Sequence, residues 1–368
     1  MSNDLPNSLD ADTLHEAWLH LLDTAARLAR EPVVVPTEAL DGAEAYRHLA
    51  TLVGYAVDMF VLSRPESPVF VRAFNADEPT ERKYLGDNAD TRYFYTNVSA
   101  DHTYRIVGRR GDDVYLSFVL HGGHRTDSLA QRVQGWINQN DLVCAPDGSF
   151  EIALGATRPD GATNWLQLPE GAACILTREY YLDRANARPA SYRIERTDGS
   201  APPVDRAAVT RAVEDAASFL ATAMGSLAAR PGPANTMSAP FRFSAELPGW
   251  GTPDNTYCGC AFDLADDEML VVEGSMVPCV YWNAQLWNVH MQSIGVPPNA
   301  ASVNSSQAGC GPHDAFRFVV AARDPGERPW LDTGGHRRGT VYVRWLCADE
   351  EPPTPTATVH PNPRPNTA

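Results

Sequence analysis

Apolar residues recur every three or four positions in three stretches of the chain, residues 11–30, 42–62 and 205–229. In the first stretch, the apolar positions that share one helical face are Leu14, Trp18, Leu21, Leu22 and Ala25. This spacing places side chains on one side of an α-helix. The sequence therefore predicts helices over these three stretches.

The apolar period changes to two from about Thr91 onward. Segments such as TYRIVG, DVYLSFVLH, SFEIALGA and ACILTREYYL are short and rich in β-branched and aromatic residues, and turn sequences such as GRRGDD and PDGS separate them. This pattern is typical of β-strands. Similar segments follow the third predicted helix as far as about Cys347. The chain is therefore predicted to be mainly β with helical additions.

The two strand-rich regions are copies of one another. A shift of 166 residues aligns positions 101–183 with 267–349 without a gap and gives fourteen identities in 83 positions. Slightly upstream, Asp90 matches Asp254 at a different offset. Such a repeat predicts two β-rich lobes of the same topology. The identical pairs include Gly108 and Gly274, Tyr115 and Tyr281, His124 and His290, Asn138 and Asn304, Phe150 and Phe316, and Arg178 and Arg344.

The repeat and the composition together divide the chain into five regions. We expect an N-terminal helical region over 1–85, a first β repeat over 86–200, a helical connector over 201–235, a second β repeat over 236–350 and a tail over 351–368. The tail, EEPPTPTATVHPNPRPNTA, is rich in proline and poor in apolar residues. Such a composition cannot bury enough apolar surface to fold, so we expect the tail to be disordered.

Several longer segments resemble a known family. They are DNADTRYFYTNV and TYRIVGRRGDDVYLSFVLHGG in the first half, and PDNTYCGCAFDLADDEMLVVEG, YWNAQLWN and WLDTGGHRRGTVYVRWL in the second. Through them the chain resembles the bacterial proteins of the DUF1214 family, a domain of unknown function, over roughly residues 85–350. The resemblance implies lobes of β-sandwich type. It implies no established reaction, although such proteins are often supposed to serve the catabolism of lipids, steroids or terpenoids.

Charge and composition narrow the classes of partner. The net charge is −16 and no run of Lys or Arg exceeds two residues, so the chain lacks the cationic surface that binds nucleic acid. It has no run of about 18 apolar residues and no export signal at its acidic N-terminus, so we expect no membrane partner and a cytoplasmic location. Seven thinly spread cysteines indicate reduced thiols.

The segment YWNAQLWNVH, residues 281–290, combines an apolar face with a polar, aromatic one. Such a strand is either half-solvated or lines a cavity in which amides and aromatic rings orient a ligand. We favour the cavity, because large aromatic side chains gain nothing from exposure to water. The residues predicted to bind a substrate are Tyr281, Asn283, Gln285 and Trp287, with Tyr115 and His121 from the first repeat.

Acid–base chemistry is the best fit to the remaining polar residues. Histidine titrates closest to neutral pH, and beside carboxylates or thiols it can transfer protons. The alternative to catalysis is that these residues recur because they have the same structural role in both repeats. The residues predicted to be catalytic are His290, Cys258, Cys260, Asp254 and His124.

Two kinds of bound group are not expected. His121 and His124, together with Cys258 and Cys260, could in principle be the ligands of a zinc ion. The paired CxxC spacing of structural zinc sites is missing, however, so we expect no metal. The GxGxxG, GxxxxGK[ST] and GxSxG motifs are also missing, so we expect no organic cofactor.

Arg178 and Arg344 stand inside otherwise apolar strands, in CILTREYY and VYVRWLC. A buried guanidinium without a counter-charge is costly. We expect structural salt bridges to Asp90 and Asp254, with substrate binding as the alternative.

Together these features predict a cofactor-free enzyme of lyase, isomerase or hydrolase type. Its substrate would be a small, partly apolar alcohol or ester, which the family resemblance narrows to a terpenoid, steroid or lipid metabolite. The alternative is a non-catalytic binding protein for an apolar metabolite, and a structural subunit of a larger complex is a third reading. We expect a small-molecule ligand as partner, and a homo-oligomer stays open.

Overall fold

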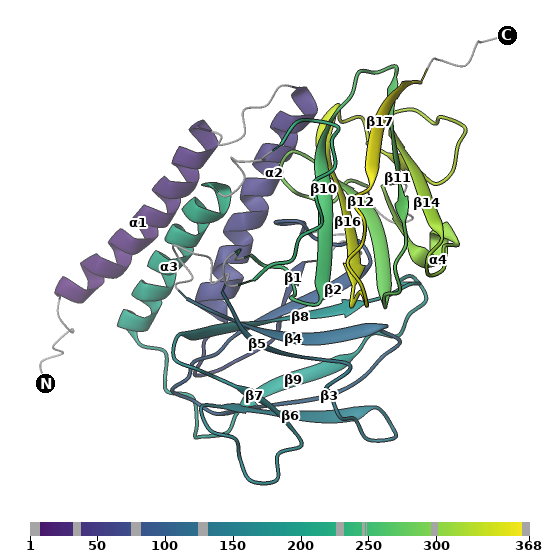
Figure 1. The fold of residues 1–368 in the computed structure, drawn as a ribbon. Helices are drawn as coiled ribbons and strands as arrows, with labels where there is room; N and C mark the ends of the chain where they lie inside the picture. Colours follow the sequence, from purple (N-terminus) through teal and green to yellow (C-terminus); the bar gives the residue numbers. More distant parts are fainter. Residues whose placement is uncertain are drawn as a thin grey trace, which may run out of the picture.

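The computed structural model describes residues 8–31, 38–74, 82–123, 132–225, 232–244, 247, 249–295 and 301–362. Figure 1 shows three parts: a group of helices at the upper left, a first β-lobe at the bottom and a second at the upper right. The mainly β prediction is confirmed. None of the helices in these ranges combines the length and apolar character that crossing a bilayer requires.

The helices are α1 (Ser8–Arg30), α2 (Ala39–Ala56), which continues into the π-helical turn η1 (Val57–Leu62), and α3 (Arg206–Gly225). The three predicted helices are confirmed with small changes at their ends. Helix α3 packs along α1, and η1 contacts both α2 and α3. Their buried faces share one hydrophobic core with the outer face of the first lobe, including Leu21, Leu52, Phe60, Phe219, Tyr95 and Leu176.

The first lobe is a sandwich of two sheets. One sheet has the order β1-β2-β8-β4-β5, formed by Val71–Phe74, Thr91–Asn97, Ala172–Tyr180, Tyr115–Gly122 and Arg132–Asn138. The other has the order β7-β6-β3-β9, formed by Asn164–Gln167, Ser149–Gly155, Tyr104–Arg109 and Ser191–Arg196. The core between the sheets includes Ile106, Leu116, Phe118, Ile152 and Ile175.

The second lobe repeats this arrangement except for β1, which has no counterpart among the described strands. One sheet has the order β10-β16-β12-β13, formed by Asn255–Asp263, Arg338–Leu346, Tyr281–Trp287 and Ser302–Asn304. The other has the order β15-β14-β11-β17, formed by Trp330–Asp332, Ala315–Ala321, Glu268–Ser275 and Thr356–Pro361. A short helix, α4 (Ser305–Ala308), follows β13. The shared topology that the repeat predicts is therefore confirmed.

The tail is a correction to the sequence prediction. Residues Thr356–Pro361 form β17 and pair antiparallel with β11, as β9 pairs with β3 in the first lobe. The expectation of disorder over 351–368 is therefore wrong for this strand. Because β17 lies at the edge of its sheet, proline beside it interrupts no further pairing. Residues 363–368 lie outside the described ranges.

One pair of repeated positions has a simple packing origin. Gly108 on β3 lies opposite Phe150 on β6, and a Cβ atom on this glycine would stand 2.5 Å from Cζ of the phenylalanine ring. Gly274 and Phe316 repeat the arrangement in the second lobe, at 2.4 Å. A strand glycine under an aromatic ring thus explains why both residue types recur.

Candidate functional site

The two lobes meet through the faces of their sheets that point away from each sandwich core. Tyr115, Tyr180, Tyr281 and Leu346 form a small buried cluster at this meeting point. The rings of Tyr180 and Tyr281, one from each lobe, have centroids 5.0 Å apart in an edge-to-face arrangement. The interface between the lobes is therefore a packed and aromatic one.

Asp254, just before β10, is held by residues of the first lobe. Its Oδ2 atom accepts hydrogen bonds from Tyr115 Oη at 2.5 Å and from Asn138 Nδ2 at 3.0 Å. Thr252 Oγ1 lies 3.1 Å from the same phenol oxygen. Burial and the nearby carboxylate raise the pKa of Tyr115 well above its usual value. The phenol therefore stays protonated and acts as the hydrogen-bond donor to Asp254.

Asp90, just before β2, is held in the same way by the second lobe. Its Oδ2 atom accepts hydrogen bonds from Tyr281 Oη at 2.7 Å and from Asn304 Nδ2 at 3.1 Å. Burial raises the pKa of Asp90 even though these hydrogen bonds lower it. The aspartate of each repeat is thus bound by the tyrosine and asparagine of the other repeat.

The polar face of β12 is buried along its whole length, so the half-solvated interpretation does not apply. Its side chains bind the segment that precedes β2. Gln285 Nε2 and Trp287 Nε1 both donate to the carbonyl oxygen of Asp87, at 2.6 and 2.8 Å. Asn283 Nδ2 donates to Asn88 Oδ1 at 3.2 Å. Many of the polar side chains of β12 therefore form hydrogen bonds between the two lobes.

The residues predicted to be catalytic lie in separate places. Cys258 and Cys260 belong to the sandwich core of the second lobe. Burial raises the pKa of Cys260 to about 12 and that of Cys258 further, so both are neutral thiols. Asp254 lies at the lobe interface, as described above. His124 lies outside the described ranges.

The two remaining predicted histidines are buried. His290 Nε2 lies 3.1 Å from the carbonyl oxygen of Asp41 on α2, and its ring is stacked on that of His48 with centroids 5.8 Å apart. His121 on β4 lies against Trp250, with ring centroids 5.0 Å apart. Neither histidine is among the residues that line the two cavities described next.

A cavity of about 90 Å³ lies where the lobes meet, and we call it the central cavity. It brings together Arg178 with Arg344, and Tyr93 with Tyr257, which are corresponding residues of the two repeats. Of the predicted binding residues, Trp287 lines it. Its other walls are Leu85, Gly86, Leu176, Tyr180, Phe243, Trp250, Gly251, Met291 and Tyr342.

Both arginines of the central cavity are almost fully buried, with 2% and 3% of their surface exposed. Arg178 donates one hydrogen bond to the carbonyl oxygen of Trp250, and its Nη1 atom has no hydrogen-bond partner in the described residues. Arg344 donates to Asn283 Oδ1 and to the carbonyl oxygen of Gly86, each at 3.2 Å. Its guanidinium also stacks over aromatic rings, at 5.0 and 5.2 Å from their centroids.

The predicted salt bridges of these arginines are wrong. Within the described ranges, neither arginine has a carboxylate oxygen within 4.0 Å of its nitrogens. Asp90 and Asp254 are instead occupied by tyrosine and asparagine donors across the lobe interface. The sequence showed that the two charges would be buried, but it could not show that their expected partners bind elsewhere.

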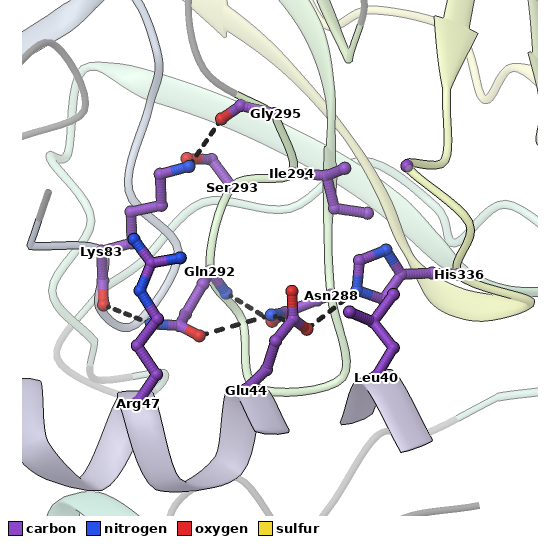
Figure 2. Close-up of a pocket in the computed structure, with 11 residues that line it drawn as sticks. Leu40, Glu44, Arg47, Lys83, Asn288, Gln292, Ser293, Ile294, Gly295 and His336 are labelled. Carbon is purple, nitrogen blue, oxygen red and sulfur yellow. Dashed lines mark hydrogen bonds and ion pairs between the residues drawn. The ribbon is translucent and has the colours of Figure 1, made fainter. Parts of the chain in front are cut away.

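A second cavity, of about 260 Å³, lies between α2 and the loop that follows β12, and we call it the lateral cavity. Figure 2 shows Glu44 and Arg47 reaching into it from α2, and His336 from the opposite side. Sequence reasoning missed this cavity, because its residues come from four distant segments and lie outside the repeat pairs. It is lined by Leu40, Glu44, Arg47, Lys83, Asn288, Gln292, Ser293, Ile294, Gly295, Gly334 and His336.

A charged pair forms one wall of the lateral cavity. Glu44 Oε2 accepts hydrogen bonds from Asn288 Nδ2 at 2.7 Å and from His336 Nε2 at 2.8 Å. His336 Nδ1 lies 2.7 Å from the carbonyl oxygen of Thr333. Because both ring nitrogens face acceptors, both carry protons and the ring is an imidazolium. Burial lowers the pKa of His336, but Glu44, together with the Thr333 carbonyl and Asp41, raises it, so the net shift is upward.

The described residues contain no group of three or more His, Cys, Asp or Glu side chains that could hold a metal ion.

Comparison with known proteins gives a family and a similar fold. The sequence model of the protein of unknown function DUF1214 matches residues 84–184. The crystal structure of an uncharacterized protein from Burkholderia cenocepacia is 30% identical, with a TM-score of 0.80 and 96% of each chain covered. The VPA0106 protein from Vibrio parahaemolyticus is 9% identical, with a TM-score of 0.46, covering 74% of this chain and 90% of its own. No curated protein matches the chain.

Proposed function

The chain belongs to the DUF1214 family, and we propose that it is a binding protein for a small carboxylate with a short apolar body, held in the central cavity between its lobes. The observation that carries this proposal is the pair of buried arginines, Arg178 and Arg344, on the wall of one cavity. A ligand carboxylate would supply the negative charge that the described residues do not place against them.

The electrostatic argument rests on the cost of burying charge. A buried ion without a counter-charge costs several kcal/mol, so two such ions side by side favour the entry of an anion. Arginine suits a carboxylate because its planar fork donates two parallel hydrogen bonds. Arg344 lowers the pKa of Asp87 and Asp90 from a distance, but burial dominates and raises both, so neither is a strong counter-ion.

The walls of the cavity determine the rest of the ligand. Aromatic side chains from both lobes surround the arginines, among them Tyr93, Tyr257, Tyr342, Trp250 and Trp287. Such walls accept an apolar or aromatic body, while a few polar groups fix its orientation. The volume of about 90 Å³ restricts the ligand to a small molecule.

We propose binding rather than catalysis because of what the cavity contains. Its titratable side chains are arginines and tyrosines, and burial raises the pKa of Tyr257 to about 12 and those of Tyr93 and Tyr342 further. A general acid or base works best when its pKa lies near the operating pH, and these phenols are far from it.

We also propose a cytoplasmic location, since all seven cysteines are free thiols.

The test is calorimetric titration of the full chain with acetate, butyrate and benzoate at neutral pH. We expect saturable binding of at least one of them, and a rise in melting temperature with its concentration. Arg178→Met and Arg344→Met should each weaken binding about tenfold or more, while Arg188→Met, at an exposed ion pair with Asp112, should not. The absence of binding by all three acids, or binding unchanged in both cavity variants, would refute the proposal.

A further inference from the structure

We propose that the solvent-facing side of α1 is an interface between two copies of this chain, which associate as a homodimer with their α1 helices antiparallel about a two-fold axis. Three features carry the proposal: an apolar patch on this side of α1, charges beside the patch that complement those of a second copy, and the place of the helix in the fold. No residue of α1 lines either cavity, so the proposal is independent of the proposed function.

Large apolar side chains lie on the solvent-facing side of α1. Trp18, Leu19 and Leu22 are 38%, 47% and 59% exposed, and we call them the α1 patch. At 3.6 residues per turn they span about 100° of the helix surface, so they form one face. The opposite side of α1 is buried in the shared helical core at Leu21 and Leu28. Helix α1 is thus apolar on two sides, whereas a surface helix ordinarily turns a polar face to water.

The position of α1 leaves this patch accessible. Helix α1 packs along α3 and contacts α2. Figure 1 shows it at the outer edge of the helical group, away from both lobes. Large apolar side chains that share one exposed face mark a contact surface, because burying them removes apolar surface from water.

The charges along α1 identify the occupant of the patch. Glu16 and Asp23 come first along the helix, and Arg27 and Arg30 lie in its last turn. All four side chains are exposed, and none of them forms an ion pair with another described residue. Two acids and two arginines leave this strip without net charge, although the whole chain carries −16. Copies of so acidic a chain repel one another on average, so a neutral strip is a favourable place for two of them to meet.

The order of these charges fits an antiparallel pair of helices. Glu16 and Arg27 are eleven positions apart, which is about three turns, so both lie on the same flank of α1 beside the patch. About a two-fold axis the same surface of each copy meets itself, so these flanks face each other. With the axis midway between positions 21 and 22, Glu16 of each copy is level with Arg27 of the other. The Leu22 side chains of the two copies then meet near the axis.

The contact is small, since each copy contributes three large apolar side chains. It therefore belongs with the weak, reversible interfaces, and we expect a dissociation constant on the order of 10 μM. The experiment is sedimentation velocity of the full chain at neutral pH over a range of micromolar concentrations. A monomer–dimer equilibrium is the expected result.

A substitution at the centre of the patch tests where the copies meet. Leu22→Glu should weaken association by about tenfold or more, because it places two carboxylates against each other near the axis. Leu22 is exposed, so the change leaves the core of the monomer intact. The matched control is Val143→Glu, at an apolar residue of the first lobe that is 58% exposed, and it should not change association.

An exchange of charges tests the orientation of the helices. Glu16→Arg and Arg27→Glu should each weaken association by about fivefold, because each sets like charges opposite one another. The double variant should restore it. Three turns separate the two residues within one copy, so this restoration can come only from contact between copies. A monomer at every concentration, association unchanged by Leu22→Glu, or a double variant as weak as the single ones would overturn the proposal.

Discussion

The phenol of Tyr115 donates a hydrogen bond of 2.5 Å to the carboxylate of Asp254, 139 positions away and in the other lobe. Tyr281 and Asp90 repeat this hydrogen bond at 2.7 Å in the opposite direction. The contacts are reciprocal, as they are across the interface of a two-fold dimer. This relationship fixes how the lobes sit on one another and so positions the central cavity.

We expect Tyr115→Phe and Tyr281→Phe each to lower the free energy of unfolding by about 1 to 3 kcal/mol. Each change removes one donor from a carboxylate at the interface and leaves the aromatic ring in place. Because the two hydrogen bonds are equivalent in the repeats, the two losses should be similar. Denaturant titration followed by tryptophan fluorescence measures them.

The control for this pair is Tyr46→Phe, since Tyr46 is an exposed tyrosine on α2. It should change the free energy of unfolding by less than about 0.5 kcal/mol. If the two interface variants were no less stable than the control, the hydrogen bonds would not hold the lobes together.

Arg178→Met should have the opposite effect on stability. The change replaces a buried guanidinium that lacks a carboxylate partner in the described residues with an apolar side chain of similar length. Replacing buried charges with packed apolar groups often stabilises a protein by about 1 to 4 kcal/mol. The ligand-free variant should therefore melt at a higher temperature than the parent protein. A lower melting temperature would mean that the arginine has a structural role.

The buried His48 should make the protein less stable in acid. Burial lowers its pKa from 6.5 to about 3, with a smaller contribution from His290. The folded state thus favours the neutral ring, so this contribution is fully present above pH 6.5 and is lost as the pH falls toward about 3. The loss is about 1.4 kcal/mol for each pH unit within this window. His48→Phe should flatten the profile of unfolding free energy against pH.

The matched control for His48 is His20→Phe, because His20 lies on the exposed side of α1. Its profile should parallel that of the parent protein. His336 has the opposite sign, since its pKa is raised and its contribution is lost as the pH rises. All other histidines, including His336, are the same in His48→Phe and in the parent protein. The difference between their two profiles of unfolding free energy against pH therefore reports on His48. Identical slopes in His48→Phe and the parent would contradict the prediction.

Cys258 and Cys260 should resist alkylation in the folded protein. Only the thiolate reacts, and burial keeps both thiols protonated. We expect iodoacetamide at mildly alkaline pH to leave them unlabelled until the chain is unfolded, as mass spectrometry of peptides can show. The half-buried Cys144 and Cys310 serve as internal references and should be labelled first. Rapid labelling of Cys258 would place a reactive thiol in the second lobe.

Much of the fold could be predicted because the sequence repeat showed that the chain contains two lobes of the same kind. Once residues 101–183 were aligned with 267–349, the topology of one lobe implied that of the other. The strand β17 was missed because its proline-rich surroundings hide a short, mostly exposed edge strand that is held mainly by backbone pairing. The corresponding strand β9 could have indicated it.

Less of the candidate sites could be predicted. Alternation along VYVRWL places Tyr342 and Arg344 on one face of β16, and both line the central cavity. The sequence predicted that Arg344 is buried, but it did not predict this cavity. The partner of a buried charge, however, depends on how the lobes pack, and no spacing encodes it. The pair of Glu44 and His336 joins residues 292 positions apart, without a repeated counterpart to mark either one.

The exchange of partners between the lobes also limits how this chain can be divided. A half-length chain would hold an aspartate, a tyrosine and an asparagine that cannot satisfy one another within the same half. Two such halves could do so only by associating about a dyad. The full chain is therefore physically equivalent to a homodimer whose subunits were fused into one polypeptide, and gene duplication of a dimeric ancestor would produce this arrangement in one step.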